Sequence, residues 1–198
     1  MKYLPLKLML LVLPLSAQAH HPMGGKTPET AVDGLLSGLG HPIIELDHFL
    51  FVVGFACLLA VCSRHILSHI GLFLGLTIVG TLLCITVPEI PLFEAGVFAT
   101  TALVGGLLML HKLDSTQILW TLAPVAGLFH GYGYGGAVVG AESTPVFSYL
   151  LGFSLIQAAL MLGIVFGLKR LSATYLTATA SRYRTPAGAL LIGLAMIV

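Results

Sequence analysis

Charged side chains are scarce in this sequence. Only 9% of the 198 residues are charged, 57% are hydrophobic, and the mean hydropathy is +1.00. Soluble globular proteins carry about 25% charged residues, so this composition is typical of a chain embedded in a lipid bilayer. The net charge of +1, without a basic patch among interleaved aromatics, argues against a nucleic-acid partner.

Cysteine is also rare. The three cysteines, Cys57, Cys62 and Cys84, lie in apolar stretches without C-x-x-C spacing. They predict neither a disulfide framework nor a zinc knuckle, and we interpret them as thiols packed like small apolar groups. The chain also lacks a G-x-x-x-x-G-K-[ST] loop for ATP, and a G-x-S-x-G setting around Ser148 or Ser154. We therefore expect no enzymatic activity.

Residues 1–19 have the pattern of a cleavable signal peptide. Two lysines flank the start of an apolar core, Leu8–Leu15, and an A-x-A cleavage motif follows at residues 17–19. An uncleaved membrane helix is the alternative interpretation. The apolar core is too short for such a helix, and Pro14 interrupts it.

Residues 20–42 follow as a polar lead-in, rich in glycine and proline, which we place outside the membrane. Cleavage of the signal peptide would make His20 the N-terminal residue, with His21 beside it. The free amine and two imidazoles could capture a metal ion, or this terminus could have no role. The sequence leaves both interpretations open.

Residues 43–198 contain six apolar segments. They predict an all-α fold: a polytopic membrane protein with a six-transmembrane-helix bundle after the signal peptide. The last segment is shorter than a helix that spans a bilayer. The segments are approximately Ile43–Cys62, Ser68–Val87, Phe93–Leu110, Gln117–Val139, Val146–Leu168 and Pro186–Val198.

The basic residues predict the orientation of this bundle. A cleaved signal peptide leaves the mature N-terminus on the periplasmic (extracytoplasmic) side, and the loops then alternate between the two sides. The bases after the first segment then fall on the cytoplasmic side, as expected for a multi-pass protein of the inner (plasma) membrane. These bases are Arg64, Lys112, Lys169, Arg170, Arg182 and Arg184.

Four ionisable side chains mark the start of the first segment, in the sequence HPIIELDH that begins at His41. An ionisable group at bilayer depth costs about 3 kcal/mol or more, so it usually has a function. If Pro42 opens a continuous helix, then His41, Glu45 and His48 share one stripe with Asp47 on its flank. Two imidazoles and a carboxylate on one face suit a divalent transition metal or a proton relay. Helix capping by His41 and an Asp47–His48 pair are the structural alternatives.

A glycine-rich stretch in the fourth segment, Gly127–Gly136, contains His130. Closely spaced glycines weaken a helix, so we expect a broken helix here, with free carbonyls that could face an ion. Packing of helices through glycine is the alternative. For Tyr132 and Tyr134 we prefer a place in the outer aromatic belt.

Other small and polar residues are expected to join helices. Gln157, within the fifth segment, is interpreted as an interhelical hydrogen-bonding residue. Glycines spaced four residues apart predict close helix contacts in the second and fifth segments. These glycines are Gly71 and Gly75, and Gly163 and Gly167.

The sequence resembles the HupE/UreJ family of nickel permeases. The resemblance rests on the signal peptide followed by histidine, on HPIIELDHFLFVVG and on GLFHGYGYGGAVVGAESTPVFSYLLGFSLIQ. It covers essentially the whole mature chain and implies the same six-span layout. It also implies that His41, Asp47, His48 and His130 carry nickel.

Four positions differ from the family pattern. Family members commonly have glycine in place of Glu45, and many have histidine in place of Tyr132 and Tyr134. An acidic residue is also often found near Gly136. These differences replace nitrogen ligands with oxygen, or remove them, so cobalt stays open as the metal beside nickel.

We therefore predict a secondary transporter that imports a divalent transition metal, with nickel as the first candidate, for hydrogenase or urease maturation. Metal ligands must be deprotonated, so uptake should fall as the pH drops through about 6.5, the unperturbed value of histidine. The expected partners are the lipid bilayer and the metal ion. The sequence leaves open whether the protein forms a homo-oligomer and whether it is linked to hydrogenase or urease maturation proteins. The expected ligands are His20, His21, His41, Glu45, Asp47, His48 and His130.

Two further functions fit the same residues. One is an accessory protein that binds metal for enzyme assembly without transporting it. The other is a haem protein with His48 and His130 as axial ligands, which would be red when purified.

Overall fold

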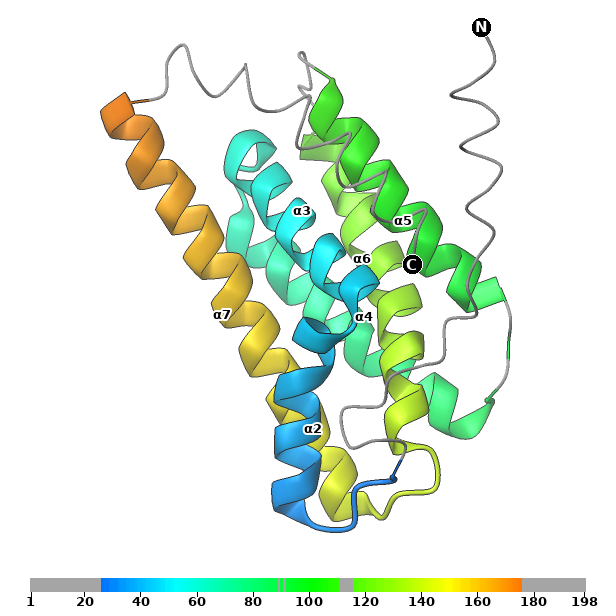
Figure 1. Cartoon of the computed structure of the whole chain (residues 1–198). Coiled ribbons are helices and arrows are strands. Elements are labelled where there is room, and N and C mark those ends of the chain that lie inside the picture. Colours follow the sequence, from blue (N-terminus) through cyan, green and yellow to red (C-terminus); the bar gives the residue numbers. More distant parts are fainter. Residues whose placement is uncertain (1–25, 89, 91, 111–115, 176–198) are drawn as a thin grey trace, which may run out of the picture.

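The computed structural model of the chain describes residues 26–88, 90, 92–110 and 116–175, with side chains as far as residue 170. All regular structure in these ranges is helical, which confirms the all-α prediction for them (Figure 1). The signal peptide, His20, His21 and the last apolar segment lie outside these ranges. The helices are α2 (Ala31–Ile44), α3 (Leu46–Cys62), α4 (Ile66–Thr86), α5 (Leu92–Met109), α6 (Thr116–Gly135) and α7 (Ser143–Tyr175), with a 3-10 turn, η1 (Gly136–Val138), after α6.

Helices α3 to α7 coincide with the first five predicted apolar segments. Three of them, α4, α5 and α7, are each long and apolar enough to cross a membrane, and the bent pair α2–α3 is a fourth if it counts as one span. Helix α6 is less apolar because its second half carries glycines, tyrosines and a histidine. Large apolar side chains such as Leu67, Phe147 and Phe166 are exposed, as a lipid-facing surface requires.

The helices form a bundle in which α6 packs between α4 and α5, and α3 packs against α5 and α7 (Figure 1). One core cluster gathers around Phe51, Phe55 and Phe73. A second, smaller cluster around Tyr134 and Tyr149 joins the end of α6 to the start of α7. The ionisable residues of the first segment lie between these two apolar clusters.

The bent pair α2–α3 has its break at Glu45, where the two helices meet at an angle of 73°. Glu45 has an extended backbone and begins α3 without a hydrogen bond from its side chain to the helix. The predicted continuous helix that opens at Pro42 is therefore wrong. Pro42 lies inside α2, where it has no N–H to donate to the preceding turn, and α2 ends at Ile44. The expected end of the lead-in, residue 42, thus lies within a helix.

The predicted break in the fourth segment is also wrong, because α6 runs continuously to Gly135. Its glycines instead bring α6 against the backbone of α4. A Cβ atom at Gly131 would overlap the carbonyl oxygen of Thr77, and one at Gly127 would overlap that of Phe73. The Thr81 hydroxyl also donates to the Gly131 carbonyl oxygen at 2.8 Å.

Glycines bring α2 against α7 in the same way. A Cβ atom at Gly38 would overlap the carbonyl oxygen of Tyr149, and one at Gly152 would meet that of Leu35. The glycines whose spacing predicted close helix contacts do not make such contacts within the described part of the chain. A Cβ atom would have no neighbour within 4 Å at Gly71, Gly75, Gly163 or Gly167.

This packing yields a stability prediction. Gly131→Ala should lower the free energy of unfolding by about 1–3 kcal/mol, because the new methyl group forces α6 away from α4. Gly75→Ala should leave stability equal or slightly higher, because its methyl group enters open space and alanine favours helix by about 1 kcal/mol. Thermal unfolding in detergent, followed by circular dichroism, measures both. Equal midpoints for the two variants would contradict this account of the α4–α6 contact.

Candidate metal site

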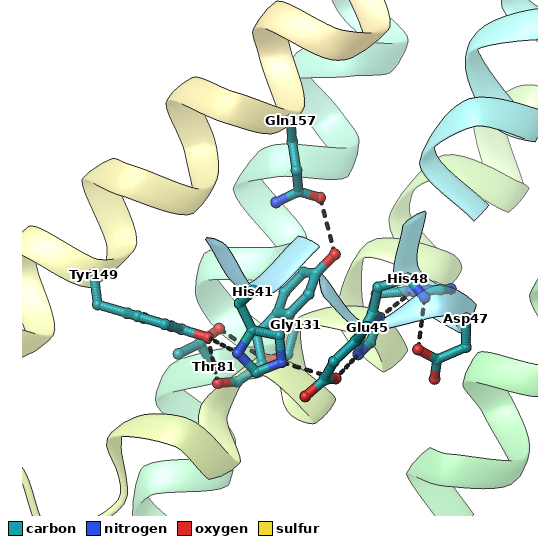
Figure 2. A network of polar contacts seen from close by, with 10 residues as sticks. His41, Glu45, Asp47, His48, Thr81, Gly131, Tyr149 and Gln157 are labelled. Carbon is teal, nitrogen blue, oxygen red and sulfur yellow. Dashed lines mark hydrogen bonds and ion pairs between the residues drawn. The ribbon is translucent and has the colours of Figure 1, made fainter. Parts of the chain in front are cut away.

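Three ionisable side chains meet at the break between α2 and α3. His41 lies in the last turn of α2, and His48 lies in the first turn of α3. The Oε2 atom of Glu45 lies 2.9 Å from Nε2 of His41 and 3.3 Å from Nε2 of His48. Both imidazoles are 2% exposed. Figure 2 shows Glu45 between the two rings, a position that the bent backbone provides.

The hydrogen bonds of His41 define which of its nitrogens carries a proton. The Tyr149 hydroxyl donates its only hydrogen to the Tyr134 carbonyl oxygen at 2.7 Å. The same hydroxyl lies 2.8 Å from Nδ1 of His41, so it must accept a hydrogen from that nitrogen. A neutral His41 therefore carries its proton on Nδ1. Its Nε2 is then free of a proton, is buried without a hydrogen-bond partner, and lies 2.9 Å from Oε2 of Glu45.

A second chain of hydrogen bonds defines the proton of His48. The Thr100 hydroxyl donates to backbone carbonyls of α5, so it accepts from Nε2 of His130 at 3.1 Å. Nδ1 of a neutral His130 is then an acceptor, and it lies 2.8 Å from Nδ1 of His48. His48 must then donate from Nδ1, which leaves its Nε2 free of a proton at 3.3 Å from Oε2 of Glu45.

Three electron-rich atoms thus lie close together, two on buried imidazoles and one on the partly exposed Glu45. Two imidazole lone pairs and a carboxylate oxygen repel unless a cation lies among them. One ligand atom from each of the three side chains lies within 4.8 Å of the others, a spacing that suits one metal ion. A proton could also occupy the place, but imidazole and carboxylate together are typical ligands of divalent transition metals.

Helix α6 forms a wall of this site. The Tyr134 ring lies 4.3 Å from the His48 ring and 5.1 Å from the His41 ring, and its hydroxyl donates to Gln157 at 3.4 Å. Gly133 is exposed, and a Cβ atom there would lie 3.1 Å from Nε2 of His48. On this side of the site no side chain of α6 covers Nε2 of His48, because the neighbouring residue is a glycine.

The predicted site residues are only partly brought together. His41, Glu45 and His48 converge, whereas His130 lies behind His48 with both ring nitrogens hydrogen-bonded. The Asp47 carboxylate accepts from the backbone N–H of His48 at 2.7 Å and points away from Glu45 (Figure 2). The expected ligands His20 and His21 lie outside the described residues.

Three residues at the site were not expected there. Tyr134 is fully buried at the histidines, so the preference for an outer aromatic belt was wrong for it. Its position four residues after His130, on the same face of a helix, was the available signal. Tyr149 and Thr100 are polar side chains in apolar segments, but they give no other sign of their role in the sequence. Gln157 accepts from Tyr134 across helices, as its interpretation predicted.

Removal of the central carboxylate tests the site. Glu45→Gln should weaken Ni²⁺ binding by at least about tenfold, because even the loss of an outer-shell partner costs that much. Glu94→Gln removes an exposed carboxylate in the first turn of α5 and should leave affinity unchanged. Calorimetric titration of the purified protein in detergent measures both. An unchanged affinity in Glu45→Gln would remove Glu45 from the ligand set.

Comparisons with known proteins identify the family of the chain. The family model described as HupE / UreJ protein matches residues 8–197. Protein HupE of Rhizobium leguminosarum bv. viciae is 27% identical over 174 residues, which are 78% of this chain and 84% of the relative. No solved structure matches the chain. Because the family match extends over nearly the whole sequence, the chain belongs to the HupE/UreJ family.

Proposed function

We propose that this protein is a membrane permease that imports a divalent transition metal, with Ni²⁺ as the first substrate and Co²⁺ as the second. The observation that carries the proposal is the convergence of His41, Glu45 and His48, with both buried imidazoles presenting Nε2 within 3.3 Å of the Glu45 carboxylate. This ligand set can replace part of the hydration shell of the ion. Imidazole and carboxylate together favour such metals over Mg²⁺ or Ca²⁺.

Charge supports transport rather than permanent storage of the ion. A divalent ion beside Glu45 leaves one positive charge uncompensated inside the bundle. The negative charge of Asp47, two residues further along, balances this positive charge through space, although the Asp47 carboxylate is turned away from the ligand atoms. Its functional role is therefore electrostatic. The ion is bound without an excess of ligand charge, which keeps its release possible.

The broken span fits the same function. In transporters, discontinuous helices place their ends at ions within the membrane. Here two helix ends meet at the site: the C-terminal end of α2, whose dipole favours a cation, and the N-terminal end of α3, whose dipole favours the Glu45 carboxylate. The membrane potential would drive import with about 2.3 kcal/mol per charge per 100 mV.

The proposal extends to the cellular setting. The protein would lie in the inner (plasma) membrane with six spans and a periplasmic mature N-terminus, where His20 and His21 could collect the ion. It would supply hydrogenase or urease maturation proteins and would catalyse no reaction itself. Membership of the HupE/UreJ family supports this assignment.

A flux assay tests the permease. The protein is reconstituted in liposomes that contain a metal-sensitive dye, and an inside-negative potential is applied. Wild-type protein should accumulate Ni²⁺, and competition with Co²⁺, Zn²⁺ and Cu²⁺ would rank the metals. His48→Ala should abolish most of the flux, whereas His65→Ala, an exposed histidine in the α3–α4 turn, should not.

Two outcomes would speak against this function. Metal binding without flux in the wild type would favour the accessory protein that binds metal but does not transport it. Full flux in both His48→Ala and Asp47→Ala would show that the ion does not pass the break between α2 and α3.

A further inference from the structure

We propose that Tyr149 and Thr100 are positioning residues that hold the two metal-binding histidines in the tautomer with a free Nε2, Thr100 acting through His130. This inference rests on the proposed function, because it concerns the affinity of the same site. It assigns a role to two uncharged side chains from α7 and α5, and it separates His130 from the residues that touch the metal.

The argument begins with a property of imidazole. A neutral imidazole carries one proton, on either nitrogen, and only the other nitrogen can bind a metal. If His41 or His48 carried its proton on Nε2, an N–H group rather than a lone pair would face Glu45. The site would then be filled by its own hydrogen bonds and would lose a ligand.

Tyr149 excludes this alternative for His41. Its hydroxyl is fully buried, and its hydrogen is committed to the Tyr134 carbonyl oxygen, which cannot donate. The hydroxyl oxygen can therefore only accept from Nδ1 of His41. Turning the hydroxyl toward His41 would leave a buried carbonyl without its partner, which is costly.

Thr100 disfavours the tautomer of His48 with its proton on Nε2, and it acts through His130. Its hydroxyl hydrogen is shared between the carbonyl oxygens of Gly96 and Val97 at 2.8 and 3.0 Å. Its oxygen accepts from Nε2 of His130, so Nδ1 of His130 accepts from His48. A reversal of a single link would place two hydrogens or two lone pairs against each other, and a reversal of the whole chain would take the Thr100 hydrogen away from the two α5 carbonyl oxygens.

The structure offers a matched control for each residue. Tyr132 is also a buried tyrosine whose hydroxyl donates to a backbone carbonyl, that of Val87, but it lies at the loop after α4. Thr101 is the buried neighbour of Thr100, and its hydroxyl donates to the Val97 carbonyl without contacting a histidine. Substitution of these control residues removes the same atoms but leaves the hydrogen bonds of His41, His48 and His130 intact.

The experiment combines metal titration with a tautomer measurement. Tyr149→Phe and Thr100→Val should each weaken Ni²⁺ binding by about 10–100-fold, the usual effect of losing an outer-shell partner. Tyr132→Phe and Thr101→Val should bind like the wild type, and Thr100→Ser should restore binding. Nitrogen-15 spectra of labelled histidines in the metal-free protein, at pH 8, report which nitrogen carries the proton.

The spectra separate a tautomer effect from a general structural one. In the wild type, His41 and His48 should be protonated on Nδ1 and His130 on Nε2. Tyr149→Phe should mix the tautomers of His41 alone, and Thr100→Val those of His130 and His48. Wild-type histidines with the opposite tautomers, or equal losses of affinity in the controls, would overturn the inference. Wild-type protein that binds Ni²⁺ with these tautomers but shows no flux would refute the proposed function and leave this inference intact.

Discussion

The repulsion between the Glu45 carboxylate and two proton-free imidazole nitrogens is the constraint on which the site depends. At 2.9 and 3.3 Å these atoms are close enough to share a cation, either a proton or a metal ion, and they repel each other without one. The surrounding hydrogen bonds do not relieve this repulsion, because each of them directs a proton away from Glu45. A soluble site could admit water among the ligands, whereas this one has its imidazoles enclosed by packed helices.

The close packing of backbones makes this arrangement possible. Gly38 lets α2 lie directly on α7, which brings Tyr149 to His41, and Gly131 lets α6 lie directly on α4. Both contacts are typical of membrane helices, where small residues replace the hydrophobic effect as the basis of association. Apolar clusters on either side hold the polar residues in register. The division of roles follows: α2 and α3 carry the ligands, and α5, α6 and α7 carry the groups that orient them.

The break lies in the first apolar segment, next to Pro42, and not in the glycine-rich fourth segment, for a physical reason. Pro42 removes a backbone donor and clashes with the preceding turn, which weakens the end of α2, and the helix ends two residues later at Ile44. The glycines of α6 remove no hydrogen bond; they only weaken a helix, and contact with α4 compensates for this. The break expected in the fourth segment was wrong, and the structure has its break in the first segment, where a continuous helix was expected.

The sequence by itself determined the helical class, the positions of five helices and the three residues that meet at the break, because hydrophobic runs and buried ionisable groups are local properties. It also determined the family, through the motifs around His41 and His130. Only the tertiary structure decided that Asp47 turns away, that His130 stands behind His48, and that Tyr134 belongs to the site. The reason is that a ligand set depends on where a proton and a lone pair point, and those directions are fixed by partners on other helices.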